Sequence, residues 1–213
     1  MGIQVDVRSS GVESAYIAAP FDVAKAELEK EGYHIISNPQ NAQLRIAQGK
    51  DSFVSRNGNL LREGILYLPG KESRLVRNSP ILNSAGKATQ EHREKREFYV
   101  TWEEAEEFLK DSIGFPRKNI EIPTKRLGDE ELTIFAIGGG DSGKAGQYGD
   151  FLFDAGIEQL PIYALDSRYV DQQSKPFARQ LWFRNLGQWS DIYVDGRNLY
   201  SDWRVRGMRS VSA

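Results

Sequence analysis

The sequence contains no cysteine, and only two histidines, His34 and His92, among its 213 residues. Without cysteine there can be no disulfide, no thiolate metal site and no cysteine nucleophile. Two histidines on separate segments indicate neither a histidine-based metal site nor a Ser-His-Asp arrangement. We therefore expect a protein that is not an enzyme, with no catalytic residues, no metal and no cofactor.

Long apolar runs are also missing. The first residues, MGIQVDVRSS, lack the apolar stretch of a signal peptide, and no run approaches the roughly 18 apolar residues of a membrane span. Asp6 stands where N-myristoylation of Gly2 would need Ser or Thr. We expect synthesis in the cytoplasm and no membrane span, while the sequence leaves the final location open.

Composition is otherwise that of an ordinary globular protein, with 39% hydrophobic and 27% charged residues. The formal net charge of -2 gives no overall nucleic-acid signature. At 213 residues the chain is long enough to bury a core without covalent cross-links.

The first 97 residues predict a small α+β unit. Residues 3–7 alternate apolar and polar side chains, which is typical of a half-buried strand. A helix is expected from an N-cap at Asp22 to a stop at Gly32. The other elements expected here are short strands over 44–48 and 52–56, a tight hairpin at Asn57-Gly58, and a strand over 59–68.

The middle of the chain begins with a charged run, residues 84–96, which is either a solvated helix or a connector. Thr101 and Glu104 then form a capping box that predicts a helix reaching about Gly114. Its early glutamates favour the positive end of the helix dipole, so we interpret them as helix support rather than metal ligands.

Residues 131–139 predict a buried strand that runs into the glycine-rich stretch 138–150. Such a stretch can cradle phosphate, but Ala145 follows Lys144 where a P-loop needs Ser or Thr, so a surface loop is favoured. A short helix over 147–155 and a strand over 159–167 follow, with Pro161 indicating an edge or strand-start position.

The C-terminal segment, residues 177–210, concentrates aromatic and arginine side chains. It holds Trp182, Trp189 and Trp203, three of the four tryptophans, among Asp, Asn, Ser and Gly clusters. Rigid aromatic rings next to adaptable polar residues are typical of binding loops. The ends of the segment, RQLWFR (179–184) and RVRGMR (204–209), are regular and strand-like, whereas the sequence between them has no steady period.

The arginines in these two ends allow two interpretations. They can form a nucleic-acid platform, with guanidinium groups on phosphates and rings stacked on bases. They can instead pin the irregular middle by holding carbonyls and carboxylates, which we favour. The pinning set is Arg179, Arg184, Arg204, Arg206 and Arg209.

The motifs RQLWFR and RVRGMR, with Leu186, Ser190, Arg197 and Leu199 spaced between them, resemble the variable region of proteins diversified by diversity-generating retroelements. The upstream runs EEAEEFLKDSIGFP, IEIPTKR and KPFARQLWF resemble the form found in small-genome archaea and bacteria. The resemblance covers residues 98–213, with a variable region at about 180–209. It implies an α+β protein with a C-type-lectin-like fold, as in the phage tropism determinant. This fold is of the type also found in formylglycine-generating enzymes. Residues 1–97 form an N-terminal α+β portion that is either separate from that fold or integrated with it.

In that family, adenine-directed mutagenesis scatters codons within a fixed framework, so the resemblance implies a ligand-binding protein with a hypervariable surface. Gln188, Trp189 and Trp203 cannot arise from an Asn codon by adenine changes and would need other template codons. The candidate ligand-binding positions are Gly187, Gln188, Trp189, Asp191, Ile192, Tyr193, Val194, Asp195, Asn198, Tyr200, Ser201, Asp202 and Trp203.

The expected partner is a protein or a cell-surface ligand, with nucleic acid as the alternative. Formylglycine-generating enzymes depend on an active-site cysteine, which this chain lacks. A calcium-dependent sugar-binding lectin is a further class, for which Asp191, Asp195, Asn198 and Asp202 would supply oxygen ligands. The alternative is that these acidic residues only stabilise turns and caps.

Overall fold

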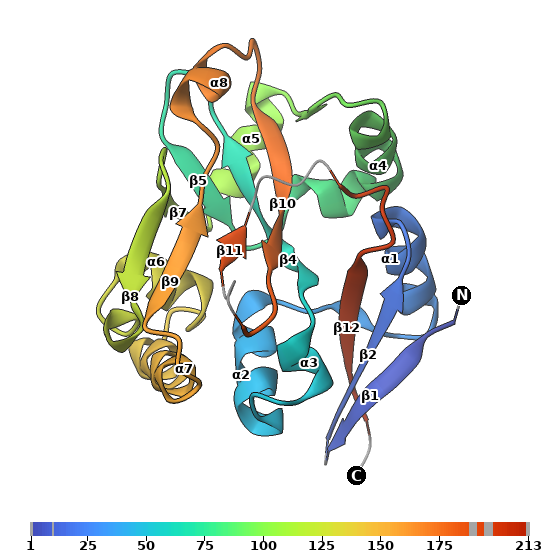
Figure 1. Cartoon of the computed structure of the whole chain (residues 1–213). Helices are drawn as coiled ribbons and strands as arrows, with labels where there is room; N and C mark the ends of the chain where they lie inside the picture. Colours follow the sequence, from blue (N-terminus) through green and yellow to red (C-terminus); the bar gives the residue numbers. More distant parts are fainter. Residues whose placement is uncertain (1, 10, 188–190, 194–197, 212–213) are drawn as a thin grey trace.

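The computed structural model describes residues 2–9, 11–187, 191–193 and 198–211, and their strands form one mixed sheet (Figure 1). The strand order is β1-β2-β12-β4-β10-β11-β9-β8, with β3 on β12, β5 on β4, β6 on β10 and β7 on β5. The strands are β1 Gln4–Ser9, β2 Val12–Ala18, β3 His34–Ile35, β4 Asn59–Tyr67, β5 Ser73–Val76, β6 Phe98–Tyr99, β7 Ser112–Phe115, β8 Ile120–Pro123, β9 Gln159–Tyr163, β10 Phe177–Phe183, β11 Ile192–Tyr193 and β12 Arg204–Ser210.

Helices cover both faces of this sheet. The α-helices are α1 Phe21–Lys30, α2 Asn38–Gln48, α3 Phe53–Arg56, α4 Ala85–Arg93, α5 Trp102–Leu109, α6 Glu131–Ala136, α7 Ser142–Asp154 and α8 Ser167–Asp171, with 3-10 turns η1 Pro80–Ser84 and η2 Thr124–Arg126. One core cluster includes side chains of α2, α3, α6 and α7, and the other includes side chains of α1, α4 and α5. The layers are therefore helix, sheet and helix.

Strand β4 lies at the centre and is buried on both faces. Leu61 and Ile65 pack into the cluster that contains α2 and α7, whereas Leu60 and Leu66 pack into the one that contains α1 and α4. Successive strand residues point to opposite faces, so a strand between two helical layers needs apolar residues at nearly every position. This requirement explains the apolar residues Leu60, Leu61 and 65–68 of the segment.

The two ends of the C-terminal segment are strands, as expected, and both pair with the first half of the chain. Strand β10 pairs with β4, and β12 pairs with β2 over its whole length and with β4 at Val205. Strand β4, in the N-terminal portion, thus lies between two strands of the C-terminal one. Residues 1–97 and 98–213 share one sheet.

Three expected strands are wrong, because residues 44–48, 52–56 and 131–139 fall largely in α2, α3 and α6. Short apolar runs fit a buried helix as well as a strand, and tertiary packing decides between them. For α2, the start is set by a capping box in which Ser37 and Gln40 bond reciprocally.

The expected hairpin at Asn57-Gly58 is also wrong, since a helix precedes β4. A Cβ at Gly58 would lie 2.5 Å from the Trp182 indole. Glycine is therefore required at residue 58 for close approach of the backbone to a ring, rather than for a turn.

Several expected elements are confirmed with shifted ends. Helix α1 starts at Phe21 and has no side-chain cap at Pro20, and the capping box at Thr101 starts α5, which ends at Leu109 instead of Gly114. Residues 84–96 hold α4, with one face buried. Helix α7 begins five residues earlier than expected because Asp141 caps it. Strand β9 lies between β11 and β8, so Pro161 is not on an edge strand.

Candidate ligand-binding surface

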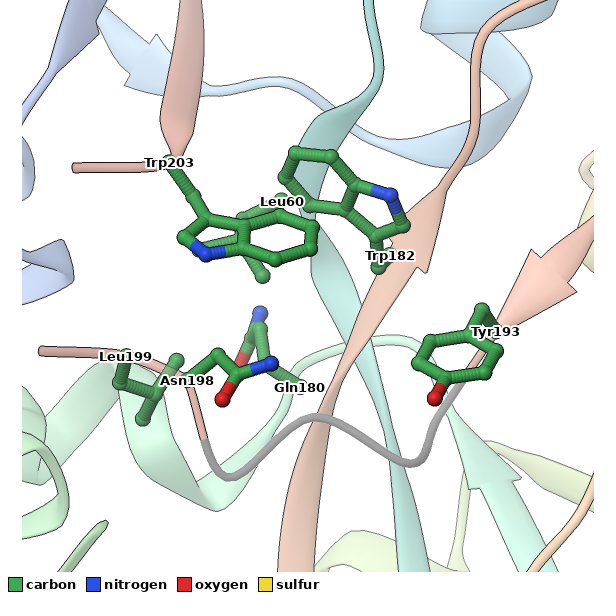
Figure 2. A pocket seen from close by; sticks show the side chains of 7 residues that line it. All are labelled: Leu60, Gln180, Trp182, Tyr193, Asn198, Leu199 and Trp203. Atoms are coloured by element: carbon green, nitrogen blue, oxygen red, sulfur yellow. The ribbon is translucent and has the colours of Figure 1, made fainter. Parts of the chain in front are cut away.

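The segment between β10 and β12 borders a small apolar pocket of about 20 Å³, room for roughly one water molecule. Figure 2 shows the side chains that face it, which come from β4, β10, β11 and the residues before β12. The Trp182 and Trp203 rings meet edge to face, with centroids 4.2 Å apart and planes at 81°. The lining residues are Leu60, Gln180, Trp182, Tyr193, Asn198, Leu199 and Trp203.

The pocket combines two kinds of position. Leu60, Gln180, Trp182 and Leu199 are buried framework residues. Tyr193, Asn198 and Trp203 are expected variable positions, and all three are half-buried. Buried framework side chains thus line the pocket together with three of the expected variable positions.

Main-chain hydrogen bonds anchor the start of this segment. The Leu186 amide donates to the Ser55 carbonyl at 2.6 Å, and the Arg184 amide donates to the Asp191 carbonyl at 3.1 Å. The buried Arg45 donates from Nη2 to the Arg184 carbonyl at 2.7 Å.

The end of the segment is anchored in the same way. The Phe21 amide donates to the Leu199 carbonyl at 2.7 Å, and the Trp203 amide donates to the Ser201 carbonyl at 2.7 Å. None of these acceptors is a side-chain atom of an expected variable position. The anchors consequently do not depend on which side chains those positions carry.

The expected surface positions divide by exposure. Tyr200 is 38% exposed, and Gly187 and Asp202 are exposed. Ser201 is half-buried, as are Tyr193, Asn198 and Trp203. Asp191 and Ile192 were also expected at the surface, but their side chains are buried, because the pairing of β11 with β10 and β9 turns them into the fold. Gln188, Trp189, Val194 and Asp195 lie outside the described residues.

Asp191 is buried beside the Arg184 guanidinium and is not part of the surface. Its Oδ2 lies 3.3 Å from Nη1 of Arg184, without a hydrogen bond to either carboxylate oxygen from the described part of the chain. Burial raises the pKa of Asp191 to about 7, although the Arg184 charge acts in the opposite direction. The Arg184 guanidinium also lies 4.5 Å from the centre of the Tyr193 ring. Arg184 therefore contacts both the buried Asp191 carboxyl group and the half-buried Tyr193 ring.

Most of the framework arginines have partners inside the fold, as the pinning interpretation requires. Arg206 is fully buried and donates to both carboxylate oxygens of Asp6 at 2.7 Å. Arg179 pairs with Glu97 at 2.6 Å, and Arg209 pairs with the Glu13 carboxylate at 2.7 Å. These three guanidinium groups are engaged and do not form a free phosphate-binding platform.

Arg204 is the exception. Its guanidinium lies 5.5 Å from the centre of the Phe53 ring, and its buried Nε has no acceptor in the part of the chain that the structure describes. The expectation that it would meet a carbonyl or a carboxylate is wrong, because the neighbouring surface is aromatic: Phe53 stacks on Tyr16 at 4.5 Å.

Within the described ranges, no group of three or more His, Asp or Glu side chains is placed to hold a metal ion. Of the four suggested calcium ligands, Asp191 is buried beside Arg184, and Asp195 lies outside the described residues. His34 is exposed on β3, whereas His92 is buried on α4. None of the described helices is long and apolar enough to cross a bilayer.

Sequence reasoning missed Arg45, which anchors the start of the segment. Its Nε donates to the Val54 carbonyl, Nη1 to the Tyr148 hydroxyl and Nη2 to the carbonyls of Asn57 and Arg184. Asn38, Asn41 and Arg45 are spaced to lie on one helix face, and that polar stripe was the available signal.

Comparison with protein-family models gives no match, and comparison with curated proteins gives none either. A solved structure described as "Accommodation of massive sequence variation in Nanoarchaeota by the C-type lectin fold" is similar to this chain, with a TM-score of 0.65 and 13% sequence identity. The alignment covers 97% of this chain and 100% of that one. The chain therefore has a C-type lectin fold, which spans both of the portions distinguished in the sequence.

Proposed function

We propose that this C-type lectin fold displays a ligand-binding surface on the segment between β10 and β12, and that a diversity-generating retroelement varies that segment. The observation that carries the proposal is the anchoring of both ends through main-chain atoms and through Arg45, a residue outside the variable region. Side chains between the anchors can change without breaking these bonds.

The character of the side chains supports binding. Tyr193 and Trp203 are half-buried beside Trp182 at the pocket, and Tyr200 is exposed elsewhere on the same segment. Large aromatic groups contribute much of the binding energy at protein interfaces. The solved structure of similar fold is described as accommodating massive sequence variation, which agrees with this use of the scaffold. We propose a protein or a cell-surface ligand as the partner.

The binding part of the proposal is tested with a library in which Tyr193, Asn198, Tyr200, Ser201 and Asp202 are randomised together. Most members should fold, because typical surface substitutions change stability by only about 0.5 kcal/mol each. Selection against several unrelated purified proteins should enrich different sequences for each target.

A matched library that randomises the buried Trp182, Phe183, Leu199 and Val205 is the control. It should yield few folded members. Equal folded fractions in the two libraries, measured by protease resistance, would contradict the division into framework and surface.

The diversification part is tested separately in the neighbouring DNA. We expect a near-copy of the coding segment for residues 180–209, differing only at adenines, beside a reverse transcriptase gene. Its absence would remove the diversification mechanism and leave the binding scaffold to be judged by the libraries.

A further inference from the structure

A polar groove lies on both sides of β3, at the end of β12 that is remote from the variable segment. It consists of two hollows of about 270 and 250 Å³ that share His34, Ile35 and Arg62 as lining residues. The first hollow also reaches Arg209, and the second reaches Lys25. Four strand residues, 204–207, separate Trp203 from Met208, the first residue of β12 that lines the groove, so roughly 15 Å of β12 lies between the groove and the variable segment.

Arg62 is unusual among the arginines of this protein. Within the described ranges, every other arginine that is half-buried or buried has a hydrogen bond, an ion pair or an aromatic ring as partner. The Arg62 side chain has none of these among the residues that the structure describes, and its buried Nε has no acceptor there. A half-buried guanidinium group is costly to leave unpaired, which points to a ligand that supplies the missing acceptors.

The charges around Arg62 favour an anion. Lys25 lies on α1 with its Nζ 2.7 Å from Glu29, which also borders the groove. Arg209 is bound to Glu13, whose carboxylate is also held by Arg8. The groups that line the groove therefore comprise three permanent cations and one carboxylate, and because Arg209 is already paired with Glu13, Arg62 is the cation left for a ligand.

We propose that Arg62 is the centre of a phosphate-binding site, with Lys25 and His34 as further contacts. A guanidinium fork matches two oxygens of a phosphate group, and the remaining oxygens can meet Lys25 and His34 from α1 and β3. A dianion suits a site with several cations better than a single carboxylate does. The phosphate can be free or carried by a larger molecule, and because the site lies outside the variable segment, it would be the same in every diversified version of the protein.

The test is titration of the full-length protein with inorganic phosphate, followed in ¹H-¹⁵N NMR spectra at constant ionic strength maintained with sodium chloride. We expect saturable shifts of the His34, Ile35 and Arg62 amides. Arg62→Ala should weaken binding about tenfold or more, the loss expected for one charge-assisted pair. Arg62→Lys keeps the charge but not the two parallel N–H donors of the guanidinium group, so it should give an intermediate affinity. It replaces the alanine variant as the test if that variant does not fold.

Arg74→Ala is the matched control, because Arg74 is also half-buried but lies on β5 beside Glu72. It should bind phosphate as the wild type does. Glycerol phosphate and inorganic phosphate should compete for the site if the phosphate group alone is recognised. Shifts that sodium chloride reproduces, unchanged affinity in Arg62→Ala, or acetate binding as tight as phosphate binding would each overturn the assignment.

Discussion

The stability of this protein should fall as the pH rises from about 5 to 8, because Glu63 is buried in an environment that disfavours its charge. Glu63 lies on β4, is 1% exposed, and accepts a hydrogen bond from the main-chain N–H of Asn38 at 2.9 Å. Its other carboxylate oxygen is buried without a partner within the described part of the chain. Burial raises the pKa of Glu63 to about 7, although hydrogen bonds and the charges of Arg62 and Arg77 act in the opposite direction.

The magnitude follows from the difference between the folded and unfolded pKa values. The unfolded pKa is 4.5 and the folded pKa is about 7, and this difference corresponds to roughly 3 kcal/mol. The folded state binds the proton more tightly than the unfolded state does. The stabilisation is therefore fully present below about pH 4.5 and is lost as the pH rises through about 7.

Glu63→Gln removes the ionisation and keeps an oxygen that can accept from Asn38. We expect the variant and the wild type to have similar unfolding free energies at pH 5. At pH 8 the variant should be more stable by up to about 3 kcal/mol, since the wild type must then ionise a buried carboxyl group or protonate it at a cost. Urea denaturation at pH 5, 6, 7 and 8 measures the difference.

Asp191 has the same sign of pKa shift, so it adds to the wild-type slope in both proteins and cancels in the comparison. Glu121→Gln, at an exposed position on β8, is the control and should show no such divergence. A difference between Glu63→Gln and the wild type that is the same at every pH would refute the assignment of the titration to Glu63.

Three further predictions concern the framework. Trp182→Ala should lower the unfolding free energy by roughly 3–5 kcal/mol, whereas joint replacement of the exposed Tyr200 and Asp202 by serine should change it by no more than about 1 kcal/mol; thermal melts that show the reverse order would contradict the assignment of framework and surface. Arg206→Ala leaves a carboxylate partner without its ion pair and should cost about 3–5 kcal/mol in urea denaturation, which a cost below about 1 kcal/mol would contradict. Gly58→Ala places a methyl group against an indole ring and should cost about 1–3 kcal/mol, with a loss of tryptophan near-UV circular dichroism; an unchanged spectrum would show that the contact is not required.

Local signals in the sequence predicted part of the fold correctly. The capping box at Thr101, the alternation in residues 3–7 and the strand-like ends of the C-terminal segment each depend on neighbouring residues, and each is found in the structure. Residues 44–48 and 131–139 were assigned wrongly because a short apolar run carries no period that separates a helix from a strand.

Part of the candidate site could be predicted in the same way. The mixture of aromatic and turn-forming residues indicated the segment between β10 and β12, and Tyr200 is exposed there as expected. The burial of Asp191 and Ile192 could not be predicted, because it depends on the pairing of β11 with β10 and β9. Those partners are distant in the chain and leave no local pattern.

By itself, the sequence determined where regular structure begins near strong caps, which segment is rich in contact-forming side chains, and that cysteine chemistry is excluded. The tertiary structure decided what each charged side chain does. Arg206 finds Asp6 across 200 residues, and Arg45 finds the Arg184 carbonyl across 139. Only the folded arrangement leaves Arg62 without a partner among the described residues and Glu63 without solvent, because desolvation and pairing depend on groups brought together from all parts of the chain.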